Sequence, residues 1–504
     1  MRHSIYGATL ACGGGHLVRV ESEISRGLSR IIVVGMPDAV TREARERLPS
    51  ALPAHGFIFP KGKVLFNLYP SQIPKRGLPL DLAMAMSTLA SQGKLSKPFP
   101  ATLFLAELDL QGRLGPPARG TILATLEAAK QNVKQIITAH ESVHEAAMVP
   151  GVTAFAFSHL GEVVDFLLQS KKFKPAKPVK FSTSFKANNR LDEVRGQSQA
   201  RQAVLIAAVG RHSLLLQGPP GTGKSLLAQR INQFLPPLAP EQALSLATME
   251  AQFGPLVHLP THPPFRAPHH TISAQGMLGG GQPLRPGELS RAHCGVLFLD
   301  ELPEYARPVL EGLRQPLEEK EVRVQRAREW ANFPADCLLV AARNPCPCGY
   351  ATHPDKPCTC TSQKLANYLL KTSGPLLDRF DLFVEMGPVS AAVLQGPPTP
   401  PHDEDCHQLA QKALAFQGCR RKKGGIGPAG NMPLEHLKQL GVKPGAKQLL
   451  ANASESMQLS GRGLVRCLRV ARTLADLEES EKIDRPHVLN SLAFRFQNSD
   501  LGLG

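Results

Sequence analysis

The sequence lacks any long apolar run. No segment of the 504 residues approaches the run of about 18 apolar residues that a membrane-spanning helix needs. The first residues, MRHSIYGATLACGGG, also lack the apolar stretch of a secretory signal peptide. We therefore expect a cytoplasmic protein that has no membrane partner.

Cysteine is too sparse for a disulfide framework. Ten cysteines are spread over 504 residues, whereas disulfide-rich folds are typical of short secreted chains. Four of the ten fall between residues 346 and 360, and in a reducing compartment such a cluster indicates a metal site. The sequence also has no internal repeat of about 20 to 50 residues, which argues against a solenoid or a propeller.

Acidic residues are too few to balance the basic ones. There are 42 Asp and Glu against 58 Lys and Arg, which gives a formal net charge of +16. An excess of this sign favours a polyanionic partner such as nucleic acid, because phosphate contacts release condensed counterions. A basic protein that is merely soluble is the alternative, since net charge bears on association and not on fold.

Residues 1–168 have the pattern of an α/β domain, in which short β-like runs alternate with helical stretches. Residues 169–190 are expected to form a basic linker, because the segment KKFKPAKPVKFSTSFKANNR holds seven basic residues and no acidic one. The elements predicted for the first domain are strands at Ile31–Val34, Lys63–Leu68, Thr102–Leu105 and Gln135–Thr138, and helices at Asp81–Leu89 and Thr121–Gln131.

A second α/β unit is predicted for residues 191–390 and a small helical domain for residues 431–504. Residues 391–430 read as a linker, since they hold a proline-rich stretch at 396–402 and the segment RRKKGGIGPAG at 420–430. The length of the chain suggests about three domains as well. The apolar residues at helical spacing in the last domain are Leu449, Leu450, Met457, Leu464, Leu468, Ala471, Leu474 and Leu477.

A complete phosphate-binding motif follows the apolar segment His212–Gln217. The motif is GPPGTGKS, and the helical stretch LLAQRINQF comes directly after it. The alternative is a chance glycine-rich turn, and the order strand, loop, helix argues against it. In that order, backbone N–H groups and the helix N-terminus both face the phosphates. Lys224 would reach the β- and γ-phosphates and Ser225 would hold Mg²⁺. The predicted ATP-binding residues are Gly218, Pro219, Pro220, Gly221, Thr222, Gly223, Lys224 and Ser225.

Two acids follow a second apolar strand. Gly295–Leu299 leads into Asp300 and Glu301, so that Asp300 would join Ser225 at the Mg²⁺ ion and Glu301 would act on a water molecule. A third apolar strand begins at Cys337 and ends near Asn344, whose amide would orient the attacking water. Taken alone, an Asn before a proline is more often a turn residue, and its place after the acid strand is what favours the catalytic interpretation.

With these motifs and several others, the sequence resembles the AAA+ ATPases, and specifically the magnesium-chelatase-like ComM/YifB family. The resemblance covers nearly the full length and implies an AAA+ P-loop core, a parallel sheet with flanking helices, that binds ATP and Mg²⁺. The other segments that carry it are FRAPHHT (265–271), GGG (279–281), RPGELS (285–290), AH (292–293), DELPE (300–304), NPCPCG (344–349) and LLDRFD (376–381).

The resemblance also implies how the catalytic site is completed. Arg379 would be the arginine finger, inserted into a neighbour's site, and Arg462 would be the sensor-2 arginine in the helical lid. An ordinary surface ion pair is the alternative for Arg379. A head-to-tail contact of this kind closes into a ring, so a homohexamer is implied.

The segment from Lys320 to Arg328 would form a hairpin before the third strand of the core. Its alternation of Val with Arg fits a two-stranded ribbon with one cationic face. Arg323, Arg326 and Arg328 are therefore candidate contacts with a DNA backbone. A solvated charged face is the alternative, because nearby glutamates dilute the positive field.

The N-terminal domain resembles the Lon-protease-like domain of the same family. Where Lon-type proteases carry a serine in G-x-S-x-G, this chain has Gly77-Leu-Pro79-Leu-Asp81, and no lysine sits at the matching position near Leu123. Proline offers no nucleophile, so we expect no peptidase activity. The domain would then serve DNA engagement or assembly.

The cysteine-rich insert at 344–361 is a candidate zinc site. Cys346, Cys348, Cys358 and Cys360 offer four thiolates for tetrahedral coordination, although C-x-C spacing is tighter than usual; His353 is a possible substitute ligand and free thiols are the alternative. Other single cysteines read as core residues, namely Cys12, Cys294, Cys337 and Cys467. His269 and His270 are expected to point to opposite sides of an extended segment, in a structural or pore-loop role.

The sequence thus predicts a hexameric ATP-dependent DNA motor. The resemblance implies a helicase or branch-migration factor that acts on single-stranded or branched DNA in recombination intermediates during natural transformation. A magnesium-chelatase-type metal-insertion motor is a first alternative. An ATP-dependent protease and a non-catalytic DNA-binding scaffold are further alternatives, disfavoured by Pro79 and by the intact Glu301 respectively.

Overall fold

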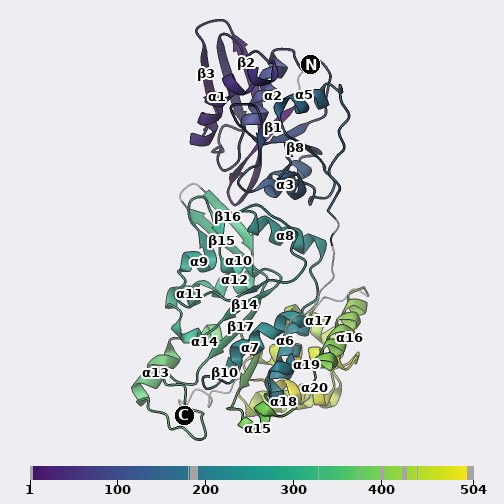
Figure 1. Cartoon of the computed structure of the whole chain (residues 1–504). Helices are drawn as coiled ribbons and strands as arrows, with labels where there is room; N and C mark the ends of the chain where they lie inside the picture. Colours follow the sequence, from purple (N-terminus) through teal and green to yellow (C-terminus); the bar gives the residue numbers. More distant parts are fainter. Residues whose placement is uncertain are drawn as a thin grey trace.

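The computed structural model describes residues 4–179, 181, 191–326, 329–372, 374–397, 402–422, 428–439 and 441–495. An N-terminal domain lies at one end, followed by a central domain with a helical domain at its side (Figure 1). Arg328 and residues 180 and 182–190 of the predicted linker 169–190 lie outside the described residues. No helix in the described ranges is both long and apolar enough to cross a membrane.

The N-terminal domain is built on a seven-stranded mixed sheet of order β3-β4-β2-β1-β5-β8-β9. The pairs β1–β2 and β2–β4 are antiparallel, and the remaining neighbours run parallel. The strands are β1 (Ile5–Ala11), β2 (Gly14–Ser25), β3 (Arg30–Val34), β4 (Lys63–Tyr69), β5 (Thr102–Leu105), β8 (Gln135–Ala139) and β9 (Thr153–Phe157), with a small ribbon of β6 (Glu107–Leu108) and β7 (Leu114–Gly115).

Helices cover both faces of this sheet. One core cluster joins the sheet to α1, α2 and α5, and a second joins its other face to α3 and α4. The four strands and two helices predicted here are confirmed, with ends shifted by no more than two residues. The helices are α1 (Ala39–Ala51), α2 (Asp81–Ser91), α3 (Thr121–Lys130), α4 (Val143–Ala146) and α5 (Leu160–Leu167), with a 3₁₀ turn η1 (Pro53–His55).

Helix α2 follows the loop that holds Pro79 and is buried from Asp81 to Leu89. A helix with apolar residues on all sides is typical of a fully buried element. Its one acid, Asp81, lies 2.6 Å from the guanidinium of Arg47, and burial raises the pKa of Asp81 from 3.8 to about 6. The ion pair only partly offsets the desolvation of the carboxylate.

The central domain has a five-stranded parallel sheet of order β11-β14-β17-β10-β18. The strands are β10 (Leu214–Gln217), β11 (Phe265–Arg266), β14 (Val296–Leu299), β17 (Leu338–Arg343) and β18 (Leu382–Glu385). Two ribbons stand apart from it: β12 (Gly279–Gly280) with β13 (Arg285–Pro286), and β15 (Glu321–Arg326) with β16 (Glu329–Pro334).

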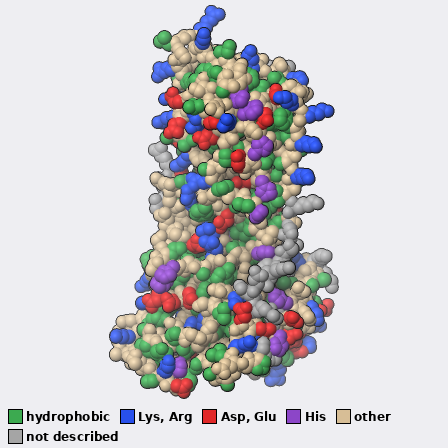
Figure 2. All heavy atoms as spheres, viewed as in Figure 1, with side chains coloured by type: hydrophobic (Ala, Val, Ile, Leu, Met, Phe, Trp, Pro, Cys, Tyr) green, Lys and Arg blue, Asp and Glu red, His purple; other side chains and the backbone are tan. Residues whose placement is uncertain are grey.

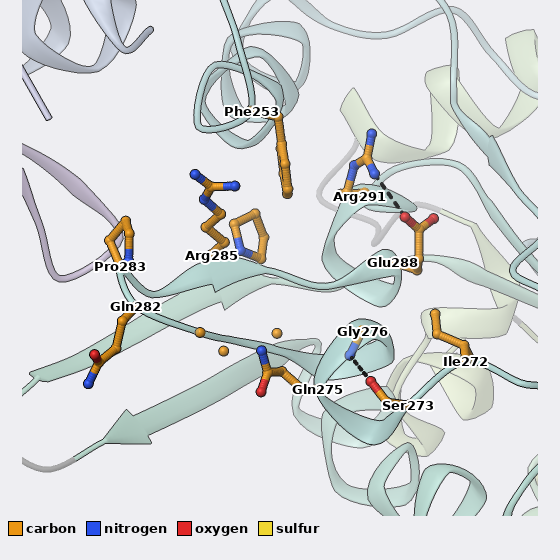
Figure 3. A pocket seen from close by; sticks show the side chains of 14 residues that line it. Phe253, Ile272, Ser273, Gln275, Gly276, Gln282, Pro283, Arg285, Glu288 and Arg291 are labelled. Carbon is orange, nitrogen blue, oxygen red and sulfur yellow. Dashed lines mark hydrogen bonds and ion pairs between the residues drawn. The ribbon is translucent and has the colours of Figure 1, made fainter.

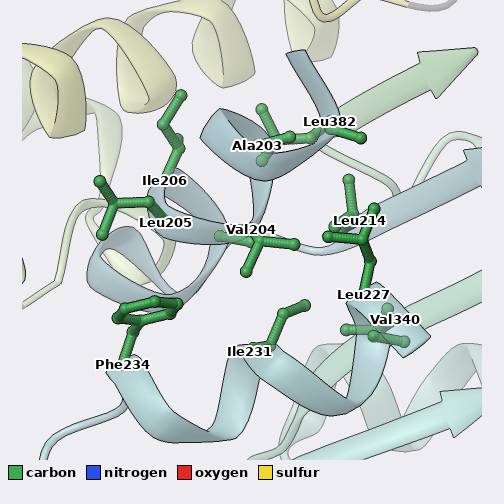
Figure 4. Close-up of a cluster of buried hydrophobic side chains, with 14 of the residues drawn as sticks. Ala203, Val204, Leu205, Ile206, Leu214, Leu227, Ile231, Phe234, Val340 and Leu382 are labelled. Atoms are coloured by element: carbon green, nitrogen blue, oxygen red, sulfur yellow. The ribbon is translucent and has the colours of Figure 1, made fainter. Parts of the chain in front are cut away.

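Helices on both sides of the sheet complete the central domain. Figure 4 shows the core beneath them, where Val204 of α6 meets Leu214, Leu227 and Val340. The elements are η2 (Leu191–Glu193), α6 (Ser198–Gly210), α7 (Lys224–Arg230), η3 (Ile231–Phe234), α8 (Pro240–Glu250), α9 (Ala274–Leu278), α10 (Glu288–Arg291), η4 (Leu302–Glu304), α11 (Arg307–Gly312), α12 (Arg314–Glu319), α13 (Ser362–Leu370), α14 (Gly374–Leu377) and α15 (Ala391–Gln395).

The helical domain begins earlier than the sequence predicted. Residues 391–430 are not simply a linker, because they include α16 (Asp403–Lys422), which packs against α6 and α19. Its buried positions hold small side chains such as Cys406, Ala410 and Ala413, so no stripe of large apolar residues marked it. The other elements are η5 (Ala429–Asn431), α17 (Leu434–Gln439), α18 (Pro444–Ser456), α19 (Gly461–Leu477) and α20 (Arg485–Leu492).

The N-terminal domain packs directly on the central domain. The cluster under α3 continues into Ala247 and Ala251, at the end of α8. Gln252 Nε2 donates to the carbonyl of Gly13 (2.9 Å), and Arg76 forms an ion pair with Glu329 of β16. The ribbon β15–β16 is therefore held against the N-terminal domain, at the end of the central domain nearest to it (Figure 1).

Candidate nucleotide-binding site

The P-loop connects β10 to α7, in the order of elements that the sequence predicted. β10 ends at Gln217 and α7 begins at Lys224, with Gly223 at its N-cap. Gly221 (φ +79°) and Gly223 (φ +88°) have left-handed backbones, which a residue with a side chain adopts only at a cost. The glycines thus bend the loop so that it opens towards the helix N-terminus, where backbone N–H groups attract an anion.

Lys224 is buried inside this loop. Its Nζ donates hydrogen bonds to the carbonyls of Gly218 (2.7 Å) and Pro219 (2.9 Å) and to Oδ1 of Asn344 (3.1 Å). Burial lowers the pKa of Lys224, while the charges of Asp300 and Glu301 oppose that shift. The lysine is therefore fixed at the point where the P-loop, the acid strand and Asn344 meet.

Ser225 and Asp300 present their oxygens side by side. Ser225 Oγ donates to Asp300 Oδ2 at 2.6 Å, and the backbone N–H of Glu301 donates to Asp300 Oδ1 at 3.0 Å. One hydroxyl and one carboxylate beside a phosphate loop are the oxygen donors that Mg²⁺ accepts, with water and phosphate supplying the rest. These two residues fit the predicted metal.

Glu301 is exposed and has a left-handed backbone (φ +50°) at the end of β14. Its Oε2 lies 3.4 Å from Nδ1 of His270. The prediction that His269 and His270 point to opposite sides is wrong: their ring centroids are 4.1 Å apart. The segment turns at this point, which brings the two imidazoles together and leaves His270 beside the acid. His270 is a site residue that reasoning from the sequence missed.

Two further contacts frame the loop. Val194 is buried and lies 3.9 Å from the position that a Cβ on Gly223 would occupy, which gives the P-loop an apolar neighbour that sequence reasoning also missed. On the other side, a Cβ on Gly349 would come within 2.6 Å of Pro220 Cδ. The cysteine-rich insert is thus packed against the back of the P-loop.

The four cysteines of the insert converge. Their sulfurs all lie within 4.8 Å of one another, and the Sγ–Sγ distances are 3.2 Å for Cys346–Cys348, 3.6 Å for Cys348–Cys358 and 3.7 Å for Cys346–Cys358. A tetrahedral ZnS₄ centre with Zn–S of about 2.3 Å has sulfurs roughly 3.8 Å apart. The donor set therefore fits zinc, and the short C-x-C spacing is no obstacle.

The remaining thiols and His353 stand apart from this centre. His353 Nδ1 accepts the backbone N–H groups of Asp355 and Lys356, both at 3.1 Å, so it is occupied as a turn acceptor. Cys294 and Cys467 are buried, and desolvation raises the pKa of each to about 11. Desolvation likewise raises the pKa of the half-buried Cys337 to about 12. The expectation for Cys12 is wrong: it is exposed, in the tight turn between β1 and β2.

Arg379 and Arg462 lie together, away from the P-loop. Both line a cavity of about 750 Å³ between the central and helical domains, and none of the residues 218–225 lines it. Arg379 Nη1 is 3.0 Å from Glu318 Oε1, and the two arginines lower the pKa of that carboxyl. The arginines further along α19, Arg466 and Arg469, also face this cavity.

The predicted ribbon is present, with Val322 and Val324 packed into the core. Arg323 is exposed and pairs with Glu321 (2.7 Å) and Glu319 (3.6 Å). Arg326 ends β15, and its side chain, like Arg328, lies outside the described residues. The ion pairs of Arg323 thus support the alternative of a solvated charged face, in which glutamates neutralise the positive charge. The DNA contacts stay a prediction.

The fold and site together define a class. A parallel sheet places the P-loop strand β10 between β17 and β18, with the acid strand β14 beyond β17, and a helical domain adjoins it. Asp300, Asn344 and Lys224 meet at the carboxyl ends of these strands, where parallel sheets bind their ligands. This is the AAA+ class of P-loop proteins.

Comparison with known proteins narrows the class. Residues 190–394 match the family model of magnesium chelatase subunit ChlI, residues 20–142 a model of the ChlI subunit of Mg-chelatase, and residues 403–495 the ChlI C-terminal model. The chain is 36% identical to competence protein ComM of Haemophilus influenzae, over 95% of this chain and 94% of that protein. It is 35% identical to YifB of Escherichia coli with the same coverage. The chain belongs to the magnesium-chelatase-like ComM/YifB family.

Similarity to Lon is partial. A Thermoplasma volcanium protein whose name proposes a Lon protease homologue is 48% identical over 48 residues, 10% of each chain. The AAA+ family suggests that the present chain is an ATPase.

Proposed function

We propose that this protein is an ATP-driven DNA motor that works as a homohexameric ring, as a helicase or branch-migration factor on recombination intermediates in natural transformation. The observation that carries the proposal is the separation of two half-sites. The P-loop and its acids lie in one place, whereas Arg379 and Arg462 line a cavity that none of the P-loop residues lines. A neighbouring copy that supplied these arginines would complete the site, and repeated head-to-tail contacts close into a ring.

Each residue of the first half-site has a definable task. The backbone N–H groups of the P-loop bind phosphate oxygens at the N-terminus of α7. Lys224 neutralises phosphate charge while Asn344 fixes its Nζ (3.1 Å). Glu301 is placed to accept a proton from a water molecule at a carboxylate oxygen, and His270, 3.4 Å away, orients that carboxylate. Mg²⁺ held by Ser225 and Asp300 would supply charge stabilisation for the phosphoryl group.

Arg379 and Arg462 make up the second half-site. A guanidinium that approaches the transferred phosphoryl group typically raises the rate about 10³- to 10⁵-fold. The partner of Arg379 within the chain, Glu318, is half-exposed at the cavity and can release it when an anion competes. Movement of the lid residues with each nucleotide state would then be transmitted to the ribbon and to DNA.

We also propose that the four-cysteine cluster holds Zn²⁺ in a structural role. The sulfurs are within 4.8 Å of one another, and closed tetrathiolate sites are typical of structural zinc. Cys346 lies two residues after Asn344, and Gly349 contacts Pro220 of the P-loop. The metal would therefore stabilise the segment that positions Asn344.

DNA is the partner that the charge supports. The net charge is +16, and a relative with 36% identity is named a competence protein. On the face shown in Figure 2, however, blue Lys and Arg side chains are spread out and interspersed with red acidic ones. The excess charge on that face forms no single patch, so local sites have to provide the DNA contacts.

The test is ATP turnover with no DNA, single-stranded DNA, duplex DNA and a four-way junction, with Lys224→Ala as the matched inactive control. We expect one DNA form to stimulate turnover several-fold and the same form to be unwound or branch-migrated in an ATP-dependent assay. Turnover that is indifferent to every DNA form, together with no strand movement, would contradict the proposal.

A second candidate is a metal-insertion motor, which the match to magnesium chelatase subunit ChlI over residues 190–394 favours. Such a motor would act on a protein–porphyrin complex. Salt-dependent binding to DNA with a steep slope would support the DNA motor, because that slope counts released counterions. Its absence would favour the second candidate.

A further inference from the structure

A cavity of about 530 Å³ lies beside the β12–β13 ribbon, where the central domain faces the N-terminal domain. Its walls include Phe253, which follows α8, Gln275 of α9, the glycine run 279–281, and Arg285 of β13. Figure 3 shows the Phe253 ring between Arg285 and Arg291, with Glu288 beyond Arg291. None of these residues belongs to the ATP site.

Phe253 is an aromatic residue that the fold leaves uncovered. Its side chain is 43% exposed, although it lies at a domain junction. Two guanidinium groups lie over the ring, with Arg291 Cζ 4.7 Å and Arg285 Cζ 5.6 Å from its centroid. A base can stack on this ring where one guanidinium group moves off its face, and the displaced cation then lies next to the base, where the phosphate is.

The two arginines differ in how far their charge is neutralised. Arg291 forms ion pairs with Glu288 (2.8 Å) and Glu250 (3.1 Å), and these two carboxylates neutralise its charge. Arg285 has no ion pair with any acid in the part of the chain that the structure describes. Its charge is therefore available for an anion from outside.

A third arginine reinforces this position from the N-terminal domain. Arg119 donates to the backbone carbonyl of Gln252 (3.3 Å), and burial followed by the positive charge of Arg285 lowers the pKa of Arg119. Arg119 likewise has no carboxylate partner among the described residues. Arg119 lines a small adjoining cavity that Arg285 also borders, and a phosphate at Arg285 would reduce the repulsion between the two charges.

The floor of the cavity is backbone. Gly279, Gly280 and Gly281 all have positive φ (111°, 144° and 90°), so side chains are disfavoured at all three positions. At Gly280 a Cβ would come within 2.9 Å of Gln275 Cγ. A floor without side chains leaves room for a flat ring or a sugar to approach, and the polar groups of the backbone and Gln275 remain within the cavity.

We propose that this cavity binds one nucleotide of single-stranded DNA: Arg285 moves off one face of the Phe253 ring to bind the phosphate, and the base stacks on the face that it leaves. The inference rests on the proposed DNA motor and places a contact outside the predicted ribbon. The cavity is continuous with that ribbon, because β12 packs against β15, and Leu284 shares a core cluster with Phe333 of β16. A strand bound here would pass directly onto β15–β16.

The test measures oligo(dT) affinity over a range of salt for Phe253→Ala and Arg285→Gln in the full chain. Stacking on one aromatic ring is typically worth about 5- to 150-fold in affinity, so Phe253→Ala is expected to weaken binding by about tenfold or more. Arg285→Gln is expected to weaken binding and to reduce the salt slope by about 0.7, the value for one phosphate contact on a single strand.

The matched controls are Tyr69→Ala and Arg19→Gln. Tyr69 is 57% exposed and also has a guanidinium, that of Arg19, 5.5 Å from its ring centroid, yet it lies at the far side of the N-terminal sheet. We expect both control variants to bind as the unmodified protein does. Binding of a fluorescent ATP analogue by every variant reports that the central domain is folded.

A second readout does not depend on substitution. Oligonucleotides that carry 5-iodouracil crosslink on irradiation to aromatic side chains stacked on the base, and we expect the crosslinked peptide of the unmodified protein to include Phe253. If the unmodified protein binds DNA but the variants bind equally and crosslinks map elsewhere, the cavity assignment is overturned and the motor proposal stands. If the unmodified protein binds no DNA in any form, both are overturned.

Discussion

The Nζ atom of Lys224 lies 3.1 Å from Oδ1 of Asn344, so the P-loop lysine is hydrogen-bonded to the residue that follows β17. The two residues are 120 positions apart, and the parallel pairing of β10 with β17 brings them together. A substitution at Asn344 therefore removes one of the hydrogen bonds that hold Lys224 in the P-loop.

Asn344→Ala should lower ATP turnover by about 100-fold, the usual effect of removing one donor or acceptor that is preorganised for the transition state. ATP binding should fall much less, because the other two hydrogen bonds of Lys224 Nζ are to backbone carbonyls. Steady-state turnover and equilibrium binding of a fluorescent ATP analogue separate the two effects. Equal losses in both would assign Asn344 to loop stability instead.

Arg379→Ala should reduce turnover by about 10³-fold while ATP binding persists, since the arginine lies away from its own P-loop. The sharper measurement mixes this variant with Glu301→Gln. If Arg379 acts in trans, interfaces that combine the intact Glu301 of one copy with the intact Arg379 of the other recover activity. A mixture as inactive as either variant alone would show that the arginine acts within its own chain.

Removal of the thiolates should release the metal and weaken the site behind the P-loop. Cys346→Ser combined with Cys358→Ser is expected to lower the zinc content from one per chain to near zero and to lower the Tm by about 5 °C or more. ATP turnover should fall as well, because Gly349 packs on Pro220. Elemental analysis and thermal unfolding are the measurements, with the exposed Cys12→Ser as control. Unmodified protein without zinc would refute the assignment.

The buried acid Asp81 predicts a pH dependence of the N-terminal domain. Burial raises its pKa from 3.8 to about 6, so between these values the folded chain holds a proton that the unfolded chain releases. The free energy of unfolding therefore falls as the pH rises from about 4 to about 6, by at most about 3 kcal/mol. Asp81→Asn should flatten this dependence in thermal unfolding at pH 5 and pH 8.

The control for Asp81 is Glu107→Gln. Glu107 also contacts Arg47, at 3.1 Å, but its side chain is half-exposed and stays solvated. We expect the pH dependence to survive in this variant. A profile that flattens equally in both variants would locate the effect at Arg47.

Much of the geometry of the candidate nucleotide site could be predicted because its signals are local. GPPGTGKS, the acids after β14 and Asn344 after β17 each follow an apolar strand, and parallel strands bring their carboxyl ends together. The cysteine cluster was visible for the same reason, although its spacing gave no guarantee that the four sulfurs would converge.

What sequence reasoning missed depends on tertiary context. β2 was not predicted because polar residues such as Arg19, Glu21 and Glu23 interrupt it, and its pairing with both β1 and β4 compensates. The contact of His270 with Glu301 requires a turn that the extended-segment assumption did not allow. The buried side chains of helix α16 are mainly alanine and cysteine. These small residues contribute little to the apolar periodicity from which a helix is predicted.

The apolar cluster shared between the domains limits where the chain can be cut. Ala247 and Ala251 are fully buried, and Leu244, Leu256 and Leu259 are packed alongside them, beneath residues of the N-terminal domain. A fragment that starts at residue 191 would present this patch to water. Such a truncated protein is expected to aggregate through this patch. Biochemical work on the central domain is therefore best done with the N-terminal domain attached.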